Sequence, residues 1–428
     1  MFSSYIAIVP MCCVTATAIA VMIAEAFRDP GERMPIAPLG AIGLTGAAIA
    51  TIALWNSRAT SFGVVVADNF GVFVTGILII VALLSLSVYV LTGIRRDRPT
   101  ATEAAFKYFL LGAFSSAFFL YGIAFTYGVT GSTRLDRIGS LLAAQGGGST
   151  PMELLAVGLV LVGFAFKISA VPFQMWTPDA YEGAPPAVAG FMSTGVKAAA
   201  FAAFMRVFLT AFGPLRGEWS AMLWVIAAAT MIVGALVGVV QSNVKRMLAY
   251  SSIAHAGYLL VALVSANDVG KGAGLFYLLS YAVANLGAFG VIALLDTANW
   301  PNDQVRDYAG LWNEHPAIAG LMTIFLLSLG GFPPMAGFIA KWYVFSAAVK
   351  AGYYWLAIIG VLTSVVSVFF YLRIVVMMYM TPTESPARFP LVPKLAGAAL
   401  IASAILVFYL GILPTRVLDW AAASITFF

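Results

Sequence analysis

The stretch GFAFKISAVPFQMWTPDAYEGAPPAVAGFMSTGVKAAAFAAF, residues 163–204, decides the fold class of this chain. It joins two long apolar runs, and each run contains one lysine, Lys167 or Lys197. A third lysine, Lys341, lies in the apolar run PPMAGFIAKWYVF at 333–345. A lysine near the centre of a bilayer costs roughly 2.5–3.5 kcal/mol on insertion scales. Because burial also favours the neutral amine, which can then take up and release a proton, these lysines predict a proton path inside a membrane protein.

The composition supports a membrane fold. Of the 428 residues, 61% are hydrophobic and only 10% are charged, which is unlike an ordinary soluble domain. Apolar runs of about 20 residues suit helices that cross a ~30 Å hydrocarbon core. The sequence therefore predicts an all-α integral membrane protein, a single polytopic domain over residues 1–428. The twelve predicted spans are 4–26, 36–55, 66–93, 105–128, 153–171, 186–211, 219–240, 246–265, 272–296, 315–350, 353–380 and 394–413.

The charge distribution predicts topology. The formal net charge of +5 comes from basic residues scattered over short loops, so we expect a lipid bilayer and no nucleic acid as partner. Loops after odd-numbered spans hold more lysine and arginine than loops after even-numbered spans. The positive-inside rule then places the odd loops in the cytoplasm and both termini outside.

The first span, 4–26, contains both cysteines of the chain, Cys12 and Cys13. Neighbours on a helix point about 100° apart, so we expect buried thiols, without a disulfide or a metal site. Since no small-residue cleavage pattern follows the apolar run, we expect the span to be retained rather than removed as a signal.

Prolines interrupt the helical pattern at two places. The first is 172–186, with Pro172, Pro178, Pro185 and Pro186, and the second is Gly-Gly-Phe-Pro-Pro at 330–334, with Pro333 and Pro334. Each break frees carbonyl groups, and transporters place such broken helices at ion sites in corresponding positions of inverted repeats. Lys167 lies five residues before Pro172, and Lys341 lies seven after Pro334. We therefore predict two inverted halves, 66–265 and 266–413.

The other polar residues of the spans allow more than one interpretation. Lys197 lies about 16 Å along a helix from Pro186, too deep for its amine to reach an interface, so a functional role is favoured. Lys245 opens a span and is either a topology signal or functional. His255 lies mid-span and is either a satisfied core residue or a member of a proton relay. Carboxylates are absent from the span interiors, so the lysines are either neutral or find partners in hydrated cavities or on another subunit.

Three motifs carry a family resemblance. FKISAVPFQMWTPDAYEGAPPAVAGFMSTGVKAAAF (166–201), KRMLAYSSIAHAGYLL (245–260) and LSLGGFPPMAGFIAKWYVF (327–345) closely resemble subunit N of bacterial NADH:quinone oxidoreductase, respiratory complex I. That family is antiporter-like and related to Mrp-type cation/proton antiporters. The resemblance covers about residues 95–413.

The resemblance implies a role for each relay residue. Lys167 resembles the lysine on the broken helix of the first half-channel, and Lys197 the lysine of the next helix. Lys245 and His255 resemble the residues of the central hydrophilic axis, and Lys341 the lysine of the second broken helix. The chain is then a non-redox subunit of a proton-translocating enzyme in the inner membrane, beside other antiporter-like subunits. NADH, FMN, iron–sulfur clusters and quinone are expected in other subunits.

The chain departs from the family pattern in three ways. The family usually has fourteen spans, and one helix pair is missing between VVVADNFGVFVTG (64–76) and ALLSLSVYVLTGIRRD (82–97). Ala82 stands where the family carries a glutamate that pairs with the lysine corresponding to Lys167. Gln174 replaces the histidine of a Pro-Phe-His motif. Two alternatives therefore remain: an Mrp-type antiporter subunit, and a structural membrane subunit whose channel has decayed.

Overall fold

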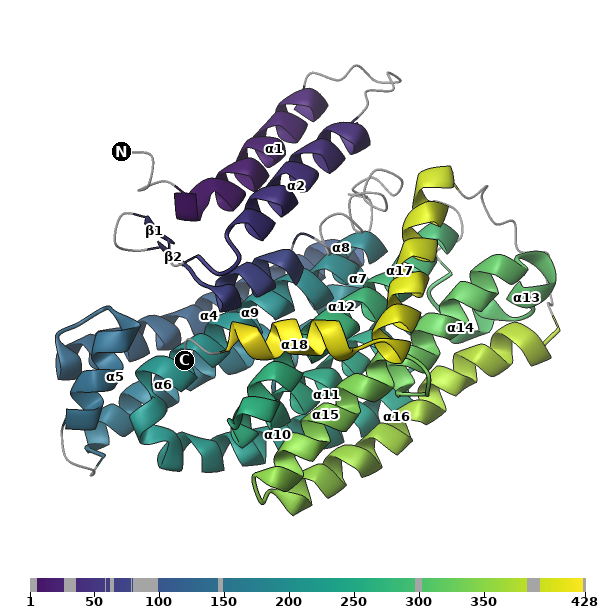
Figure 1. Cartoon of the computed structure of the whole chain (residues 1–428). Helices are drawn as coiled ribbons and strands as arrows, with labels where there is room; N and C mark the ends of the chain where they lie inside the picture. Colours follow the sequence, from purple (N-terminus) through teal and green to yellow (C-terminus); the bar gives the residue numbers. More distant parts are fainter. Residues whose placement is uncertain are drawn as a thin grey trace.

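The computed structural model describes residues 6–26, 36–57, 59–61, 65–77, 79, 99–144, 149–296, 302–382 and 393–425. These ranges are almost entirely helical (Figure 1). The long helices are α1 (Val9–Ala26), α2 (Ile36–Ala53), α4 (Pro99–Thr130), α6 (Pro151–Ile168), α10 (Arg216–Val239), α11 (Val244–Ser265), α12 (Asp268–Leu295), α14 (Pro316–Gly330), α15 (Ala336–Lys350), α16 (Tyr354–Met380) and α17 (Lys394–Ile412). The shorter helices are α5 (Leu135–Ala144), α7 (Trp176–Gly183), α8 (Pro186–Phe191), α9 (Lys197–Arg206), α13 (Leu311–Glu314) and α18 (Thr415–Ser424), with π-helical turns at Met192–Val196 and Val207–Ala211.

The helices coincide with the predicted spans. In the described part of the chain, eight helical stretches are long and apolar enough to cross a membrane, and three shorter apolar helices accompany them. The third predicted span, 66–93, is helical over 69–77, and most of its remainder lies outside the described residues. The predicted all-α membrane fold is therefore confirmed.

The structure adds short elements that the hydropathy pattern did not predict. Helices α5, α7, α13 and α18 have ten residues or fewer, too short to span a bilayer. Strands β1 (Ala59–Ser61) and β2 (Val65–Ala67) pair antiparallel, with Ala59 opposite Ala67. Hydropathy reports long apolar runs, so elements of this length give no separate signal.

Helices α11 and α12 form the centre of the bundle, with α10, α15 and α16 packed around them (Figure 1). Nearly every residue of both central helices is buried. The α10–α11 contact depends on small residues, because a Cβ added to Gly234 would lie 2.5 Å from the backbone nitrogen of Ala254. Close backbone approach at glycine is the usual way in which membrane helices pack.

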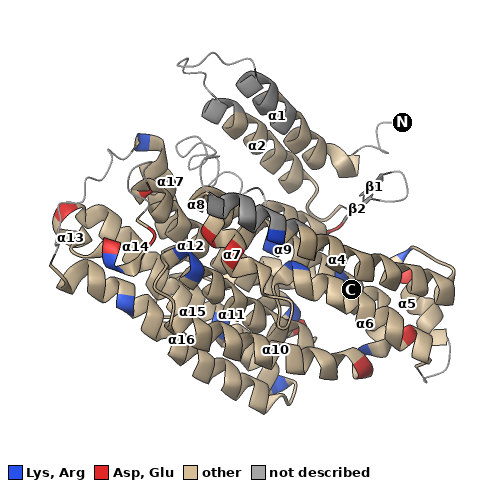
Figure 2. Ribbon diagram, turned by 180° about the vertical axis from the view of Figure 1, so that it is seen from behind, with Lys and Arg blue, Asp and Glu red and all other residues tan. Residues whose placement is uncertain are grey.

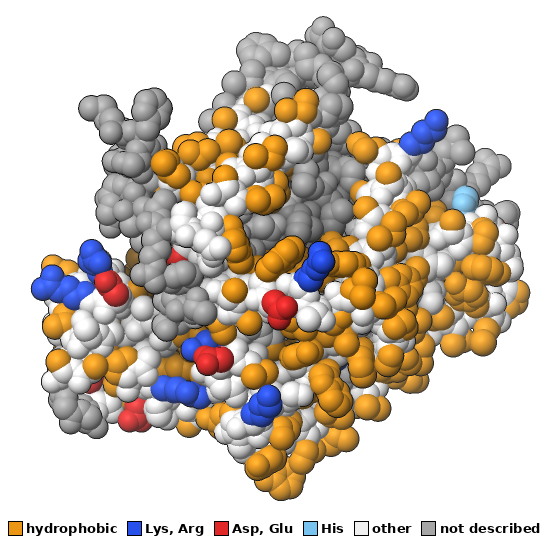
Figure 3. Space-filling model, in the orientation of Figure 1, with side chains coloured by type: hydrophobic (Ala, Val, Ile, Leu, Met, Phe, Trp, Pro, Cys, Tyr) orange, Lys and Arg blue, Asp and Glu red, His pale blue; other side chains and the backbone are white. Residues whose placement is uncertain are grey.

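Charge is sparse over the part of the fold that the structure describes. Figure 2 shows few charged residues on the ribbon, and Figure 3 shows one face of the molecule on which apolar side chains predominate. Large apolar side chains are exposed along the outer helices, among them Phe114 of α4 and Val365 of α16. Such a surface is suited to lipid or to other membrane helices.

Both predicted helix breaks are present. Helix α6 ends at Ile168 and α7 begins at Trp176, so Pro172 lies in the break. Helix α14 ends at Gly330 and α15 begins at Ala336, so Pro333 and Pro334 lie in the second break. The first interruption is shorter than predicted, because α7 forms within 172–186. Pro178 is the third residue of α7, Pro185 precedes α8, and Pro186 is its first residue. In the first turn of a helix the backbone amides have no intrahelical partner, so proline breaks no helical hydrogen bond there.

Candidate functional site: buried lysines around α11

Three of the four relay lysines are buried. The exposed fraction is 2% for Lys197, 1% for Lys245 and 6% for Lys341. Lys167 is exposed, although it lies in a similar apolar run, so its expected burial is wrong for the chain as described. Lys167 projects from the face of α6 that packs against α4, and its ammonium lies 5.9 Å from the ring centre of Tyr108 on that helix.

Lys197 is held against α11. It is the first residue of α9 and follows directly on the π-helical turn Met192–Val196. Its Nζ donates to the carbonyl oxygen of Ser252 at 2.9 Å and lies 2.5 Å from the Oγ of the same residue. A wide turn rotates the residues that follow it, and here it turns the lysine toward the central helix.

His255 is linked to tyrosines of two neighbouring helices. Its Nδ1 lies 2.6 Å from the hydroxyl of Tyr277 on α12, and its Nε2 lies 3.3 Å from the hydroxyl of Tyr371 on α16. The Tyr371 hydroxyl also bonds Ser251. Both ring nitrogens thus have a hydroxyl partner that can donate or accept, so the geometry is compatible with either tautomer.

Lys341 lies beside the second break. Its Nζ donates to the carbonyl oxygens of Leu329 at 3.0 Å and Gly330 at 2.8 Å, and to the Oγ of Ser364 at 2.7 Å. The same ammonium lies 5.2 Å from the ring centre of Tyr258. The two carbonyls belong to the end of α14, where backbone acceptors no longer have intrahelical donors. The lysine therefore caps the broken helix.

The two breaks follow one hydrogen-bonding pattern. Helix α6 ends with a left-handed residue at Ser169 (φ 64°), and α14 ends with one at Gly331 (φ 90°). One residue later, the amide of Ala170 bonds the carbonyl of Ala165 at 2.8 Å, and likewise Phe332 bonds Leu327 at 3.0 Å. This is the Schellman arrangement of a helix C-terminus.

The shared pattern places Lys167 and Lys341 differently. Lys167 precedes the left-handed residue of its break by two positions, whereas Lys341 follows its own by ten. Ten residues after Ser169 lies Asp179, the fourth residue of α7, whereas Lys341 is the sixth residue of α15. The sequence paired the two lysines only by their nearness to proline.

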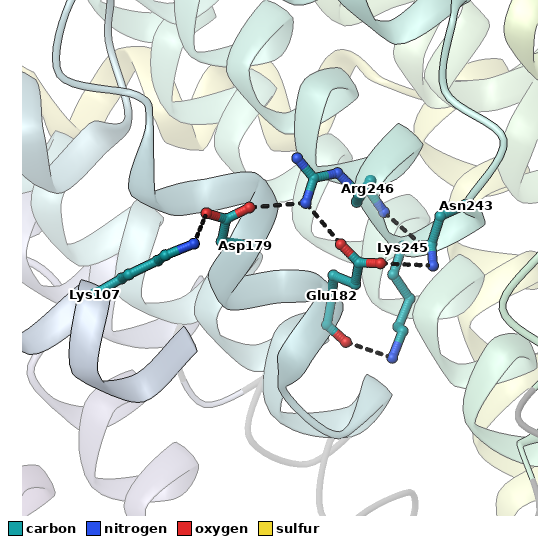
Figure 4. A network of polar contacts seen from close by, with 6 residues as sticks. All are labelled: Lys107, Asp179, Glu182, Asn243, Lys245 and Arg246. Carbon is teal, nitrogen blue, oxygen red and sulfur yellow. Dashed lines mark hydrogen bonds and ion pairs between the residues drawn. The ribbon is translucent and has the colours of Figure 1, made fainter. Parts of the chain in front are cut away.

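Lys245 belongs to a network of charges where α4, α7 and α11 meet (Figure 4). Its Nζ donates to the carbonyl oxygen of Glu182 at 2.7 Å and lies 3.3 Å from Oδ1 of Asp303. Lys245 and His255, which the sequence grouped, are not in contact, because ten residues separate them by about 15 Å along α11.

Arg246 is the centre of this network. Its Nη1 donates to Asp179 and to Glu182, each at 2.7 Å, and Lys107 lies 3.1 Å from the other oxygen of Asp179. Partial burial alone would raise the pKa of Asp179, but the hydrogen bonds from Lys107 and Arg246 outweigh it and hold that pKa below its ordinary value. Asn243 completes the contacts of Glu182 at 3.3 Å.

Sequence reasoning missed several polar contacts of the site. Tyr277 and Tyr371 come from apolar runs, in which a single tyrosine gives no local signal. Asp179 and Glu182 lie in the Pro-rich segment, and no local pattern links them to Lys245 and Arg246. The carboxylate of Glu153, buried at the start of α6, was not considered. Of the two departures, Gln174 lies in the first break, and Ala82 lies outside the described residues.

The chain is similar to known membrane proteins. A family model described as NADH:quinone oxidoreductase/Mrp antiporter, TM, matches residues 74–367. NADH-quinone oxidoreductase subunit N of Trichlorobacter lovleyi is 42% identical over 468 residues, with 98% of this chain and 96% of the relative covered. NADH-quinone oxidoreductase subunit N 1 of Solibacter usitatus is 46% identical over 342 residues, with 79% of this chain and 70% of the relative covered.

Solved structures share the fold. A chain of respiratory complex I from Thermus thermophilus with bound aureothin has a TM-score of 0.80 at 32% identity, covering 97% of this chain and 99% of that chain. A chain of the Mrp complex from Dietzia sp. has a TM-score of 0.72 at 20% identity, covering 98% of this chain and 91% of that chain, a likeness of fold alone. The chain therefore belongs to the NADH:quinone oxidoreductase/Mrp antiporter family and is an integral, multi-pass membrane protein.

Proposed function

We propose that this chain is the N subunit in the membrane arm of a redox-driven NADH:quinone oxidoreductase, and that it moves protons through a buried lysine and histidine relay. The relationship to subunit N supports this assignment, because it extends over almost the full length of both chains. The likeness to the Mrp complex extends to the fold alone. It therefore supports the alternative function, a separate cation/proton antiporter, less strongly than the subunit N relationship supports the proposed one.

One observation supports the proposed relay most directly. Three residues of α11, Ser252, His255 and Tyr258, are spaced three apart and form one stripe that winds about 120° around the helix. Lys197 bonds the first, and Lys341 lies over the ring of the third. The stripe is about 9 Å long at 1.5 Å per residue. The two lysines thus approach the histidine from opposite ends of one helix stripe.

The proposed steps follow from the protons that each group can accept and release. The amine of Lys197 takes up a proton and passes it toward Ser252 and His255. The imidazole of His255 accepts on one nitrogen and releases from the other, with Tyr277 and Tyr371 as hydroxyl partners. The buried hydroxyls of Tyr258 and Tyr281, whose rings lie beside that of His255, make no close hydrogen bond to the described residues, and buried polar groups of this kind usually bond ordered water.

Lys167 and Lys245 have more peripheral roles in this proposal. Lys167 is exposed beside Tyr108 of α4, so we assign it to the inlet of the first half. Lys245 fixes the end of α11 through Glu182 and Asp303. It belongs to the charged network of Figure 4, about 15 Å along α11 from His255.

The rest of the assignment follows from the family. We propose that the chain is a non-redox subunit, with NADH, FMN, iron–sulfur clusters and quinone bound by other subunits of the complex. Its partners are neighbouring antiporter-like membrane subunits. The excess of basic residues in odd-numbered loops supports an orientation in which the charged network of Figure 4 faces the cytoplasm and both termini lie outside.

Isolation in mild detergent tests the assignment. The chain is expected to co-purify with the redox and membrane subunits of an NADH:quinone oxidoreductase. If it instead migrates alone and exchanges sodium for protons in liposomes, it is an antiporter and the proposal is wrong. If it co-purifies but substitution of its buried lysines leaves proton pumping unchanged, its role is structural.

A further inference from the structure

A cavity of about 640 Å³ lies between the first turn of α12, helix α18 and Tyr343 of α15, away from the relay. Small-molecule sites commonly have volumes of about 300–1,000 Å³. The lining is amphipathic. Its charged groups are Asp268, Lys271 and Asp419, and its apolar wall includes Leu418 and Ala422.

Lys271 has unused hydrogen-bonding capacity. Its side chain is 18% exposed, and its ion-pair partner, Asp268, lies 3.6 Å away, beyond hydrogen-bond distance. An ammonium has three N–H donors. The side chain is mostly covered and its ammonium has one loose partner, so a further acceptor would stabilise it, and an oxyanion in the cavity would supply one.

The charge balance of the cavity defines the ligand class. Asp268 and Asp419 contribute two negative charges and Lys271 one positive charge, so a purely anionic ligand meets net repulsion. A zwitterion that joins a phosphate to an ammonium group matches both signs. Its phosphate can approach Lys271 and the hydroxyl of Thr415, while its ammonium approaches Asp419.

The cavity also lies where a lipid headgroup would be. Asp268 begins a candidate membrane span, so the rim of the cavity is at one end of a transmembrane helix. Helix α18 is amphipathic, because Val417 and Ala421 are buried while Asp419 and Trp420 are exposed, as in helices and aromatic belts at membrane interfaces. Figure 1 shows α18 across the outside of the bundle, and Figure 3 shows charges of both signs on that otherwise largely apolar face.

We propose that this cavity binds the headgroup of a zwitterionic aminophospholipid, of the phosphatidylethanolamine type. The phosphodiester contacts Lys271 and Thr415, the primary amine donates to Asp419, and an acyl chain follows Leu418 and Ala422. A primary amine is required because a quaternary ammonium, as in phosphatidylcholine, has no N–H to donate.

Native mass spectrometry of the intact complex tests the proposal. Purified complex is placed in nanodiscs of phosphatidylcholine alone, or with added phosphatidylethanolamine or phosphatidylglycerol, and the lipids that stay bound are counted. The wild type is expected to retain one more phosphatidylethanolamine than the Lys271→Gln and Asp419→Asn variants. Each variant should bind that lipid on the order of tenfold more weakly, as expected when a charge-assisted hydrogen bond is lost.

Three further variants sharpen the test. Lys271→Arg keeps the charge and should keep the lipid. Ala422→Trp fills the cavity without changing a charge and should lose it. Asp136→Asn removes a carboxylate whose partner is the exposed Arg134, elsewhere on the surface, and should have no effect. Equal lipid retention in all variants, a preference for phosphatidylglycerol, or a neighbouring subunit seated in the cavity of the complex would each overturn the proposal.

Discussion

Asp179 and Lys341 each lie ten residues after the left-handed residue, Ser169 or Gly331, that ends the helix before a break. At this distance the first break presents a carboxylate held by side chains, and the second presents an ammonium held mainly by backbone carbonyls. The two breaks thus share a hydrogen-bonding pattern at the helix end, and the charges that follow them have opposite signs.

Replacing Asp179 with asparagine should lower stability by about 1 kcal/mol, because two charge-assisted contacts are weakened at a partly exposed site. The folded-state pKa of Asp179 lies below its ordinary value of 3.8. Its contribution is therefore fully present above that value and is lost as the pH falls through the lower, folded-state pKa. Thermal unfolding of wild type and Asp179→Asn should differ by a constant amount from neutral pH down to about the ordinary value. A difference that already disappears near neutral pH would contradict this account.

Lys197→Ala should reduce proton pumping at least tenfold while part of the electron transfer remains, because the amine that bonds Ser252 is removed. Lys197→Arg keeps the charge but cannot release a proton, so it should fail in the same way. Pumping is measured by the quenching of a pH-sensitive dye in proteoliposomes. Lys350→Ala, an exposed lysine at the end of α15, is the control. Normal pumping by Lys197→Ala would exclude the relay.

Tyr277→Phe should slow pumping several-fold, because it removes the hydroxyl 2.6 Å from Nδ1 of His255 and leaves a buried nitrogen without that partner. Tyr379→Phe removes a hydroxyl that lies 3.3 Å from Thr323 in an exposed contact, and should leave pumping unchanged. Comparing the two rates, with complex assembly checked in both, separates a role in the relay from a general effect of losing a tyrosine.

Ala82→Glu should change the pH profile of pumping if Lys167 carries protons, since it restores the carboxylate that the family has at this position. The rate is measured across neutral pH in wild type and in the variant. A pH profile identical to that of the wild type would show that the first half-channel does not contribute. Lys167→Ala serves as the matched variant, and in that case it should also be without effect.

Gly337→Ala should destabilise the second break, because the added Cβ would lie 1.8 Å from the carbonyl oxygen of Ser328. Overpacking of this kind costs about 1–3 kcal/mol, and it would also move α15, which carries Lys341. Gly320→Ala on α14 is the control, since nothing lies within 4 Å of its added Cβ. The measurement is the thermal midpoint of the purified complex. Equal midpoints would show that the break can relax.

The spans and breaks were predictable because their signals are local. A run of about 20 apolar residues predicts a membrane-spanning helix, and a pair of prolines predicts a helix break, in each case without reference to the rest of the chain. The same logic gave the burial of Lys197 and Lys341. It was wrong for Lys167, because hydropathy averages over a helix and does not report which face a residue is on.

The contacts of the site were less predictable from the sequence. Tyr371 comes from 116 residues beyond His255, and Arg246 from 67 residues beyond Asp179. No periodicity links residues so far apart. Helix α7 was not predicted, for a different reason. Its proline, Pro178, lies in the first turn, where proline is tolerated. Together with the other prolines of 172–186, it suggested a segment without any helix.

The capping of α14 by Lys341 has a consequence for the energetics of losing a proton. A buried lysine paired with a carboxylate leaves a full negative charge stranded in the membrane each time it is discharged. Lys341 is balanced instead by carbonyl dipoles at a helix end, equivalent to roughly half an elementary charge. Deprotonation then leaves behind only a partial charge that the helix already carries. The broken helix therefore acts as a permanent half-counterion for the lysine.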